Sequence, residues 1–333
     1  MPHGPSQSLL LGLLAALVVA AFLASLLVGP AGLPLSTAFQ ALFSNENPAA
    51  ALVMREIRMP RAILAALIGG TLGLTGAVLQ GFLRNPLADP NILGISSSAA
   101  LGAVLVIYTG LSATFALALP LAAMAGALLA VMVIYTLSGS HAGTLTLILA
   151  GLAISTFAGA MTTLVLNLSP NPYAALEIVY WMLGSLTDRS WTHVLLAAPF
   201  IVVGSLLLAL SARALDALTL GADVAASLGI DLPRTRTLIV LGAAMAIGAA
   251  TAVAGAIGFI GLVVPHVLRP LVGRQPSRLL PASAIAGASL LLLADVAVRV
   301  IAPARDIKLG VLTALIGAPF FVWLVLKTRR EMA

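Results

Sequence analysis

Asp295 and Arg299 are the residues whose types and spacing point most directly to chemistry. They lie four residues apart in an apolar stretch, so both side chains would face the same side of a helix. Two interpretations remain open. The residues form either a local ion pair near one end of a helix, or part of a proton relay of the kind that buried acids often mark. A single acid beside a cation makes a poor relay, so the ion pair is favoured.

Other catalytic and cofactor-binding patterns are missing from the sequence. The only lysines are Lys308 and Lys327, and neither follows a glycine-rich loop, so no P-loop can cradle ATP phosphates. No nucleophile elbow of the form G-x-S-x-G occurs. The four histidines lack metal-ligand spacing: His3, His141, His193 and His266. These observations predict a protein that is not an enzyme and holds no cofactor or metal.

The composition describes the surroundings in which the chain folds. Of its 333 residues, 61% are hydrophobic and 8% are charged, against roughly 25% charged in an average soluble domain. The apolar runs are long and do not alternate, which favours membrane-spanning helices over a barrel. There is no cysteine, and the net charge of +6 comes without a basic run that would indicate nucleic acid. The sequence therefore predicts an all-α integral membrane protein with a single transmembrane domain over residues 1–333.

About ten spans are expected. Their predicted limits are 9–28, 60–83, 92–109, 115–137, 143–168, 191–212, 236–257, 259–268, 280–300 and 310–327. Span 259–268 is too short to cross a membrane alone, so it is predicted to be a half-helix buried in protein. The first span is expected to be retained rather than cleaved as a signal peptide.

An even number of spans puts both termini on one side of the membrane. More Lys and Arg residues flank the spans on the side of the termini than on the other side, which favours cytoplasmic termini.

Two connecting segments stand out. Residues 169–190 suggest a short re-entrant helix outside, and residues 213–235 suggest two short amphipathic helices on the cytoplasmic side with a turn at Gly221.

A weak inverted five-helix repeat is also visible. Gly69 and Gly76 open a glycine-spaced segment, and Gly248 and Gly255 open a similar one five spans later. An odd offset inverts the second copy, as in many transporters. The alternative, equally open, is that small residues merely let helices pack closely.

Three stretches together resemble the permease subunits of type II ABC importers for iron-siderophores, haem and cobalamin. The first comprises residues 58–61 (RMPR), 84–90 (RNPLADP) and 93–96 (LGIS). The second comprises residues 228–230 (LGI) and 255–266 (GAIGFIGLVVPH). The third contains Asp295, Arg299 and residues 310–321 (GVLTALIGAPFF). The sequence departs from the family pattern at Ala256, Gln275, Asp306 and Lys308, which puts only local loop geometry in doubt.

The resemblance implies a homodimer in the bacterial inner membrane that works by alternating access. Two separate ATPase subunits would bind ATP and Mg²⁺, and a periplasmic binding protein would deliver the cargo. Haem is the favoured cargo, with a ferric siderophore or cobalamin as alternatives. Two rivals of other classes remain: an ion-coupled secondary transporter and an intramembrane enzyme.

The resemblance also implies three sets of site residues. Docking of the binding protein would use Arg58, Arg61 and Arg299, although each alone could be a snorkelling interfacial residue. Coupling to the ATPase would use Leu215, Leu220, Gly221, Ala225, Leu228 and Gly229, although an amphipathic helix on the membrane surface would look similar. A cytoplasmic gate would use Asn85, Leu87 and Thr144, although Asn85 before a proline also suits a plain helix stop.

Overall fold

Every regular element in the described part of the chain is a helix. The structure is a computed structural model that describes residues 7–29, 32–138, 144–169, 171–273, 275–301 and 307–332. The first half contains α1 (Gln7–Leu27), α2 (Leu35–Phe43), α3 (Pro48–Leu52), α4 (Met59–Phe82), α5 (Ile95–Tyr108), α6 (Leu111–Thr114), α7 (Ala118–Ser138) and α8 (Thr144–Asn167). The second half contains α9 (Pro172–Met182), α10 (Trp191–Leu210), α11 (Ala212–Leu218), α12 (Ala222–Ser227), α13 (Leu232–Ala254), α14 (Ile260–Leu268), α15 (Pro276–Ile301) and α16 (Leu309–Met332). The all-α fold class is confirmed.

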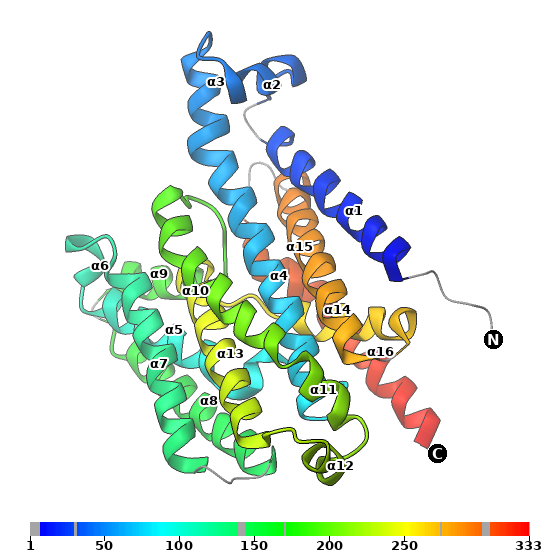
Figure 1. Cartoon of the computed structure of the whole chain (residues 1–333). Helices are drawn as coiled ribbons and strands as arrows, with labels where there is room; N and C mark the ends of the chain where they lie inside the picture. The colour runs from blue at the N-terminus through cyan, green and yellow to red at the C-terminus, as the bar shows by residue number, and fades with distance from the viewer. Residues whose placement is uncertain are drawn as a thin grey trace.

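The ten predicted spans correspond to ten helices. Within the described residues, 8 helices are long and apolar enough to cross a membrane, and α5 and α14 are shorter apolar helices. The main difference is at the second span. A π-helical turn (Val53–Arg58) joins α3 to α4, so one helix runs for 35 residues from Pro48 to Phe82 and projects beyond its neighbours (Figure 1).

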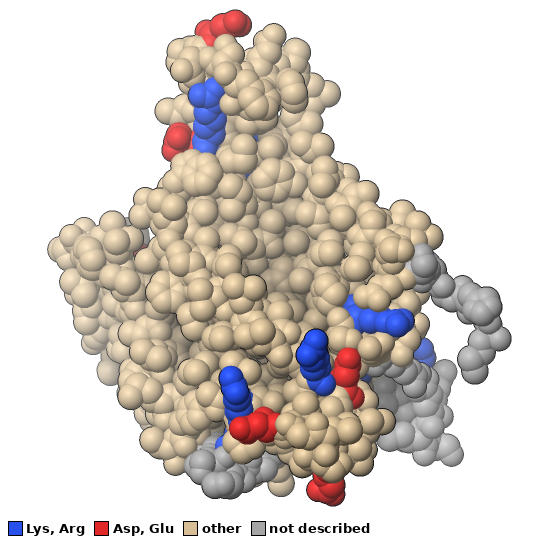
Figure 2. Space-filling model, viewed as in Figure 1, with Lys and Arg blue, Asp and Glu red and all other residues tan. Residues whose placement is uncertain are grey.

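Helix α16 ends toward the same end of the helix bundle as α11 and α12, whereas α1 ends toward α2 and α3 (Figure 1). Figure 2 shows charged side chains at both ends of one face and a broad belt without charge between them. A lipid bilayer favours this distribution, because a charge at membrane depth is costly.

Helices α4 and α13 form the centre of the bundle. Each is part of a candidate span that is 78% buried, and the two run in opposite directions (Figure 1). These are the helices that open the two copies of the predicted repeat. Their antiparallel directions are those that an inverted repeat requires.

Glycines allow α4 and α15 to touch along their backbones. A Cβ atom added at Gly69 would lie 2.3 Å from the carbonyl oxygen of Gly287, and one at Gly73 would lie 2.1 Å from that of Ser283. Only glycine fits at such distances. The two helices therefore form a close pair that extends through the bundle.

The predicted half-helix is also present. Helix α14 has 9 residues, of which Ile260, Gly261, Leu262, Val264, Pro265 and Leu268 are buried. It starts after Phe259, whose φ of +68° is unusual for a bulky residue. In the non-helical segment that precedes α14, Gly255 and Ile257 are buried whereas Ala256 is exposed, so the segment is only partly enclosed by protein.

Candidate docking, coupling and gating sites

Asp295 is the centre of a charged cluster at the α2–α3 end of the bundle. Arg61 Nε donates to Asp295 Oδ1 and Oδ2 at 3.0 and 3.1 Å, and Arg61 Nη2 donates to Oδ1 at 2.8 Å. Arg299 Nη2 lies 2.9 Å from Oδ2. Asp295 itself is fully buried. Both carboxylate oxygens are thus held by guanidinium groups, which supports an ion pair rather than a proton relay and adds Arg61 to it.

Arg58 belongs to the same end but contacts backbone instead of the carboxylate. It is 4% exposed, and its Nη1 donates to the carbonyl oxygens of Leu26 and Leu27 at 2.7 and 2.9 Å. These are the last carbonyls of α1, which have no partner within the helix. Gly29 leaves the necessary room, since a Cβ there would lie 2.9 Å from Arg58 Nη2.

Arg299 completes the attachment of α1. Its Nη1 donates to the carbonyl oxygens of Ser25 and Val28 at 2.9 and 2.7 Å, and its Nη2 donates to Ser25 Oγ at 2.8 Å. A positive charge at this position also offsets the negative end of the α1 dipole. The three arginines predicted for docking are therefore brought together, but as links among α1, α4 and α15, with Arg58 buried and Arg61 and Arg299 partly buried. The sequence signal for Asp295 was its spacing to Arg299, whereas nothing in the sequence pointed to the α1 carbonyls.

The six coupling positions divide into three kinds. Leu215 and Ala225 are fully buried, whereas Leu220 and Leu228 are 65% and 61% exposed. Gly221 and Gly229 have φ values of +121° and +83°, which glycine adopts at no steric cost. The predicted pair of short helices with a turn at Gly221 is confirmed. Val224, 42% exposed, adds to the apolar surface and was not predicted.

Helix α11 connects this surface to α4 and α15. A Cβ at Gly81, in the last turn of α4, would lie 3.5 Å from Leu215 Cδ2. Asp216 accepts hydrogen bonds from the backbone N–H of Ser277 at 2.9 Å and from Gln275 Nε2 at 3.3 Å, at the start of α15. The same two helices that carry the charged cluster at one end therefore contact α11 at the other.

The predicted gate residues lie at the ends of helices on the α11–α12 side. The side chain of Asn85 closes a turn after α4, where its Oδ1 accepts from the backbone N–H of Leu87 at 2.9 Å. Asn85 is exposed and Leu87 is half-buried. Thr144 is the first residue of α8, and its side chain is outside the described residues. The turn is thus present, and a gating role remains a prediction.

Gln80 fixes the segment that carries Asn85 and Leu87. Its Nε2 donates to the carbonyl oxygens of Gly261 and Leu262 at 3.3 and 3.2 Å, and its Oε1 accepts from Arg269 Nη2 at 2.7 Å. Gln80 and Arg269 are 189 residues apart, and the sequence did not reveal that they meet. This network joins α4 to the half-helix α14.

A pocket of about 460 Å³ lies at the end opposite α11 and α12. Its walls combine aromatic and charged side chains: Tyr173, Glu177, Tyr180, Trp181, Asp188, Arg189 and Lys308. Lys308 Nζ lies 5.3 Å from the centre of the Tyr180 ring, a cation–π distance. Burial lowers the pKa of Arg189, and the charge of Asp188 opposes this shift. The pocket offers flat apolar faces and both signs of charge.

Comparison with known proteins places the chain in a family. Residues 17–327 match the model of the FecCD transport family. The chain is 43% identical to the cobalamin import system permease BtuC of Halobacterium salinarum over 279 residues, which cover 83% of this chain and 74% of that protein. It is 39% identical to the hemin transport system permease HmuU of Yersinia pestis over 328 residues, 97% of each chain.

A solved structure is also similar to this chain in fold and sequence. It is described as a metal-chelate type ABC transporter in an inward-facing conformation, and it superposes with a TM-score of 0.85 at 31% identity over 95% of this chain and 98% of its own. The helical architecture of this chain therefore agrees with that of the solved structure over nearly its whole length. This chain is a multi-pass membrane permease of the FecCD transport family.

Proposed function

We propose that this permease moves haem across the bacterial inner membrane as the homodimeric membrane part of an ABC importer. The observation that carries the choice of cargo is the similarity to the hemin transport permease, which extends over 97% of both chains. The aromatic pocket with Lys308 and Arg189 suits a flat molecule that bears carboxylates. Cobalamin is the second candidate, because the cobalamin relative has the higher identity over a shorter match. A ferric siderophore would use the same type of importer.

The orientation follows from the exposed groups at the two ends. The end with α11, α12 and both termini would face the cytoplasm, and the end with α2 and α3 would face the periplasm. The exposed side chains of Leu220, Val224 and Leu228 would then lie where two ATPase subunits can bind them. These subunits would carry ATP and Mg²⁺, and the permease would supply two packings of its helices that the ATPase cycle favours in turn.

Docking of a periplasmic binding protein would take place at the charged cluster. Two arginines pair with the one buried acid and Arg58 lies nearby on the α1 carbonyls, so the cluster carries excess positive charge to attract carboxylates. The side chain of Arg61 is 16% exposed and that of Arg299 is 7% exposed, so Arg61 is the more accessible partner. A carboxylate of the binding protein would compete with Asp295 for these guanidinium groups, whereas Arg58 would have to leave the α1 carbonyls first.

During alternating access, α4 and α15 would couple the docking end to the ATPase end. Docking acts on Arg61 and Arg299, and the ATPase acts on α11, which contacts both helices through Leu215 and Asp216. The turn at Asn85 and Leu87 and the start of α8 at Thr144 would form the cytoplasmic gate. Closure of the gate is a property of two copies, one on each side of the pathway.

The decisive experiment for the cargo is growth of a strain that lacks this gene, with haem as the only iron source. Loss of growth on haem with normal growth on ferric siderophores and with normal cobalamin uptake supports the proposal. Normal growth on haem, in a strain shown to have no second haem importer, refutes haem and leaves cobalamin and siderophores to be tested. Complementation with the unchanged gene is the control.

A further inference from the structure

A groove of about 810 Å³ lies on the face formed by α1, α4, α10 and α15. Its walls are almost entirely aliphatic, with Val19, Leu67, Leu206 and Ile285 among the lining residues. Two of its few polar groups, Thr71 Oγ1 and Ser205 Oγ, are 3.0 Å apart and hydrogen-bond to each other. The floor therefore offers hydrocarbon contacts and little for a polar molecule to bind.

One end of this groove is basic. Ala212 and Ser277 line the groove where α11 begins, and the next residue after each is an exposed arginine, Arg213 and Arg278. Within the described parts of the chain, neither guanidinium makes a hydrogen bond or an ion pair. The acid nearby is Asp216, whose carboxylate is already engaged by Ser277 and Gln275. Figure 2 shows basic side chains at the corresponding lower end of the face, below the uncharged belt.

We propose that this groove binds one anionic phospholipid. The acyl chains would lie between α1 and α10 against α4 and α15, and the phosphate would lie between Arg213 and Arg278. Basic groups beside apolar clefts on transmembrane helices recognise anionic head groups in this way. Arginine suits the task because its fork of N–H donors matches two phosphate oxygens.

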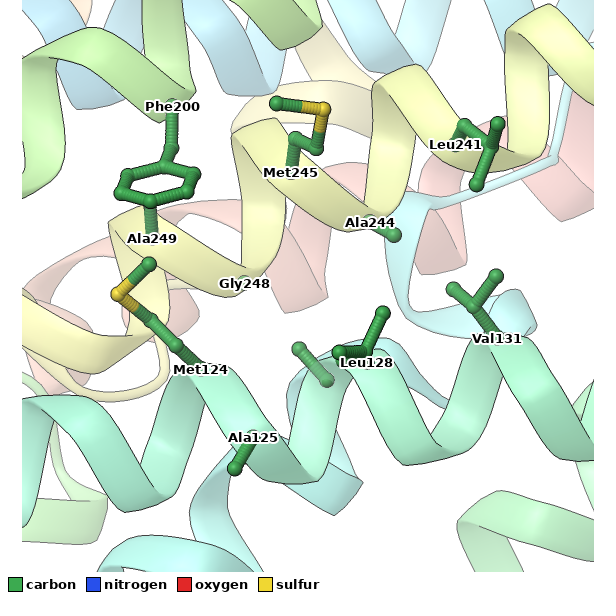
Figure 3. A pocket seen from close by; sticks show the side chains of 11 residues that line it. Met124, Ala125, Leu128, Val131, Phe200, Leu241, Ala244, Met245, Gly248 and Ala249 are labelled. Atoms are coloured by element: carbon green, nitrogen blue, oxygen red, sulfur yellow. The ribbon is translucent and has the colours of Figure 1, made fainter.

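A second cavity shows why the basic end matters. It has a volume of about 220 Å³ and lies where α7 meets α13, with Met124 and Leu128 of α7 pointing toward α13 and with Phe200 beside Ala249 (Figure 3). None of its lining residues is charged or adjacent in sequence to a charged residue. This cavity therefore offers apolar contacts without an anchor for a charged head group.

A second copy of the chain fits the groove less well than a lipid. Two copies related by a two-fold axis would place identical patches opposite each other. Arg213 and Arg278 of one copy would then face the same arginines of the other, and like charges at short range repel. A lipid phosphate instead brings the opposite charge.

The test uses the purified full-length chain and native mass spectrometry with synthetic phosphatidylglycerol or phosphatidylcholine. The double variant Arg213→Gln with Arg278→Gln removes the anchor. Arg234→Gln, an exposed arginine at the start of α13, is the matched control. Ala284→Phe fills the groove without changing charge. Glycerol phosphate serves as the free head group, and single-cysteine chains with Leu206→Cys, on a cysteine-free background, report contact between copies.

We expect the purified chain to retain phosphatidylglycerol in preference to phosphatidylcholine. Retention should fall about tenfold in the double variant and clearly in Ala284→Phe, and should not change in Arg234→Gln. Equal retention of both lipids, unchanged retention in either groove variant, or equally tight binding of glycerol phosphate would overturn the proposal. So would efficient Leu206→Cys cross-linking between copies, which would show that a second chain covers the groove.

Discussion

At the α2–α3 end of the bundle, helices are joined by ion pairs around Asp295, whereas at the α11–α12 end they are joined by apolar packing, hydrogen bonds and close turns. Arg61 and Arg299 share the buried Asp295, and their excess charge is compensated partly by α1 carbonyls. At the other end, Leu215 and Ala225 are buried while Leu220 and Leu228 are exposed. The charged end can exchange partners when another carboxylate arrives. The apolar end can transmit movement, because a packed contact resists separation.

The largest expected effect comes from removing the acid at the charged end. Asp295→Ala leaves two buried guanidinium groups without a counter-charge, which typically costs about 3–5 kcal/mol. We expect a large drop in thermal unfolding temperature of the detergent-solubilised chain. Glu56→Gln, an exposed acid at the same end, is the control and should change stability by less than about 0.5 kcal/mol. An unchanged unfolding temperature for Asp295→Ala would show that the cluster does not hold the helices together.

Variants at the apolar end should distinguish residues that stabilise the fold from residues that bind the ATPase. Leu215→Ala removes a fully buried side chain and should cost about 2–5 kcal/mol of folding stability. Leu220→Ala with Leu228→Ala should leave folding intact and weaken ATPase binding by about 2 kcal/mol, or roughly thirty-fold.

Binding of the purified ATPase to the permease in nanodiscs measures the second effect, and Leu195→Ala, which is exposed near the start of α10, is the control. If the double variant binds the ATPase as tightly as the unchanged chain, the exposed leucines are not the contact surface.

The connection between the ends depends on the glycines of α4 and α15. Gly73→Ala would place a Cβ 2.1 Å from the carbonyl oxygen of Ser283, so the helices must move apart, at a cost of about 1–3 kcal/mol. Gly12→Ala, where nothing lies within 4 Å, should be neutral or slightly stabilising because alanine favours helix. Thermal unfolding measures both variants, and transport by reconstituted complexes tests whether coupling is lost in Gly73→Ala. Equal behaviour of the two variants would contradict a close helix contact.

The smallest expected effect is a difference between the two ends in how strongly ionic strength changes the rate of association with their partners. Raising ionic strength from about 0.05 M to about 0.5 M should slow association with the binding protein several-fold, because exposed charges steer that encounter. Association with the ATPase through apolar side chains should change little. Surface plasmon resonance on the nanodisc-embedded permease measures both rates. An association rate of the binding protein that does not change with salt would argue against docking at the arginines. The Arg61→Gln variant should show a smaller salt dependence of this rate than the unchanged chain.

Much of the fold was predictable because lipid imposes simple rules on sequence. Long apolar runs located ten helices, and a run too short to cross located the half-helix α14. The upstream extension of α4 was missed because Arg55, Glu56 and Arg58 interrupt the apolar pattern, although a π-helical turn continues the helix through them. The two short helices on either side of Gly221 were predictable because a glycine turn separates two segments that each have an apolar face.

The sites were predictable as residues but not as contacts. The resemblance identified Arg58, Arg61 and Arg299, yet their neighbours come from distant parts of the chain. Asp295 was recognised through its spacing to Arg299, since that partner is local. Its bond to Arg61, the α1 carbonyls held by Arg58, and the meeting of Gln80 with Arg269 depend on how helices assemble, and no local pattern records this.

The bond between Arg61 and Asp295 also has a consequence for how the protein is made. Arg61 is synthesised 234 residues before its acidic partner. In the orientation proposed above, the π-helical turn and the start of α4 carry Arg55, Arg58 and Arg61 to the outer side, against the usual preference for basic residues inside, before Asp295 has been made. Ribosome-attached intermediates that stop short of α15 would therefore hold α4 without its acidic partner, and we expect the synthesis of α15 to stabilise the position of α4.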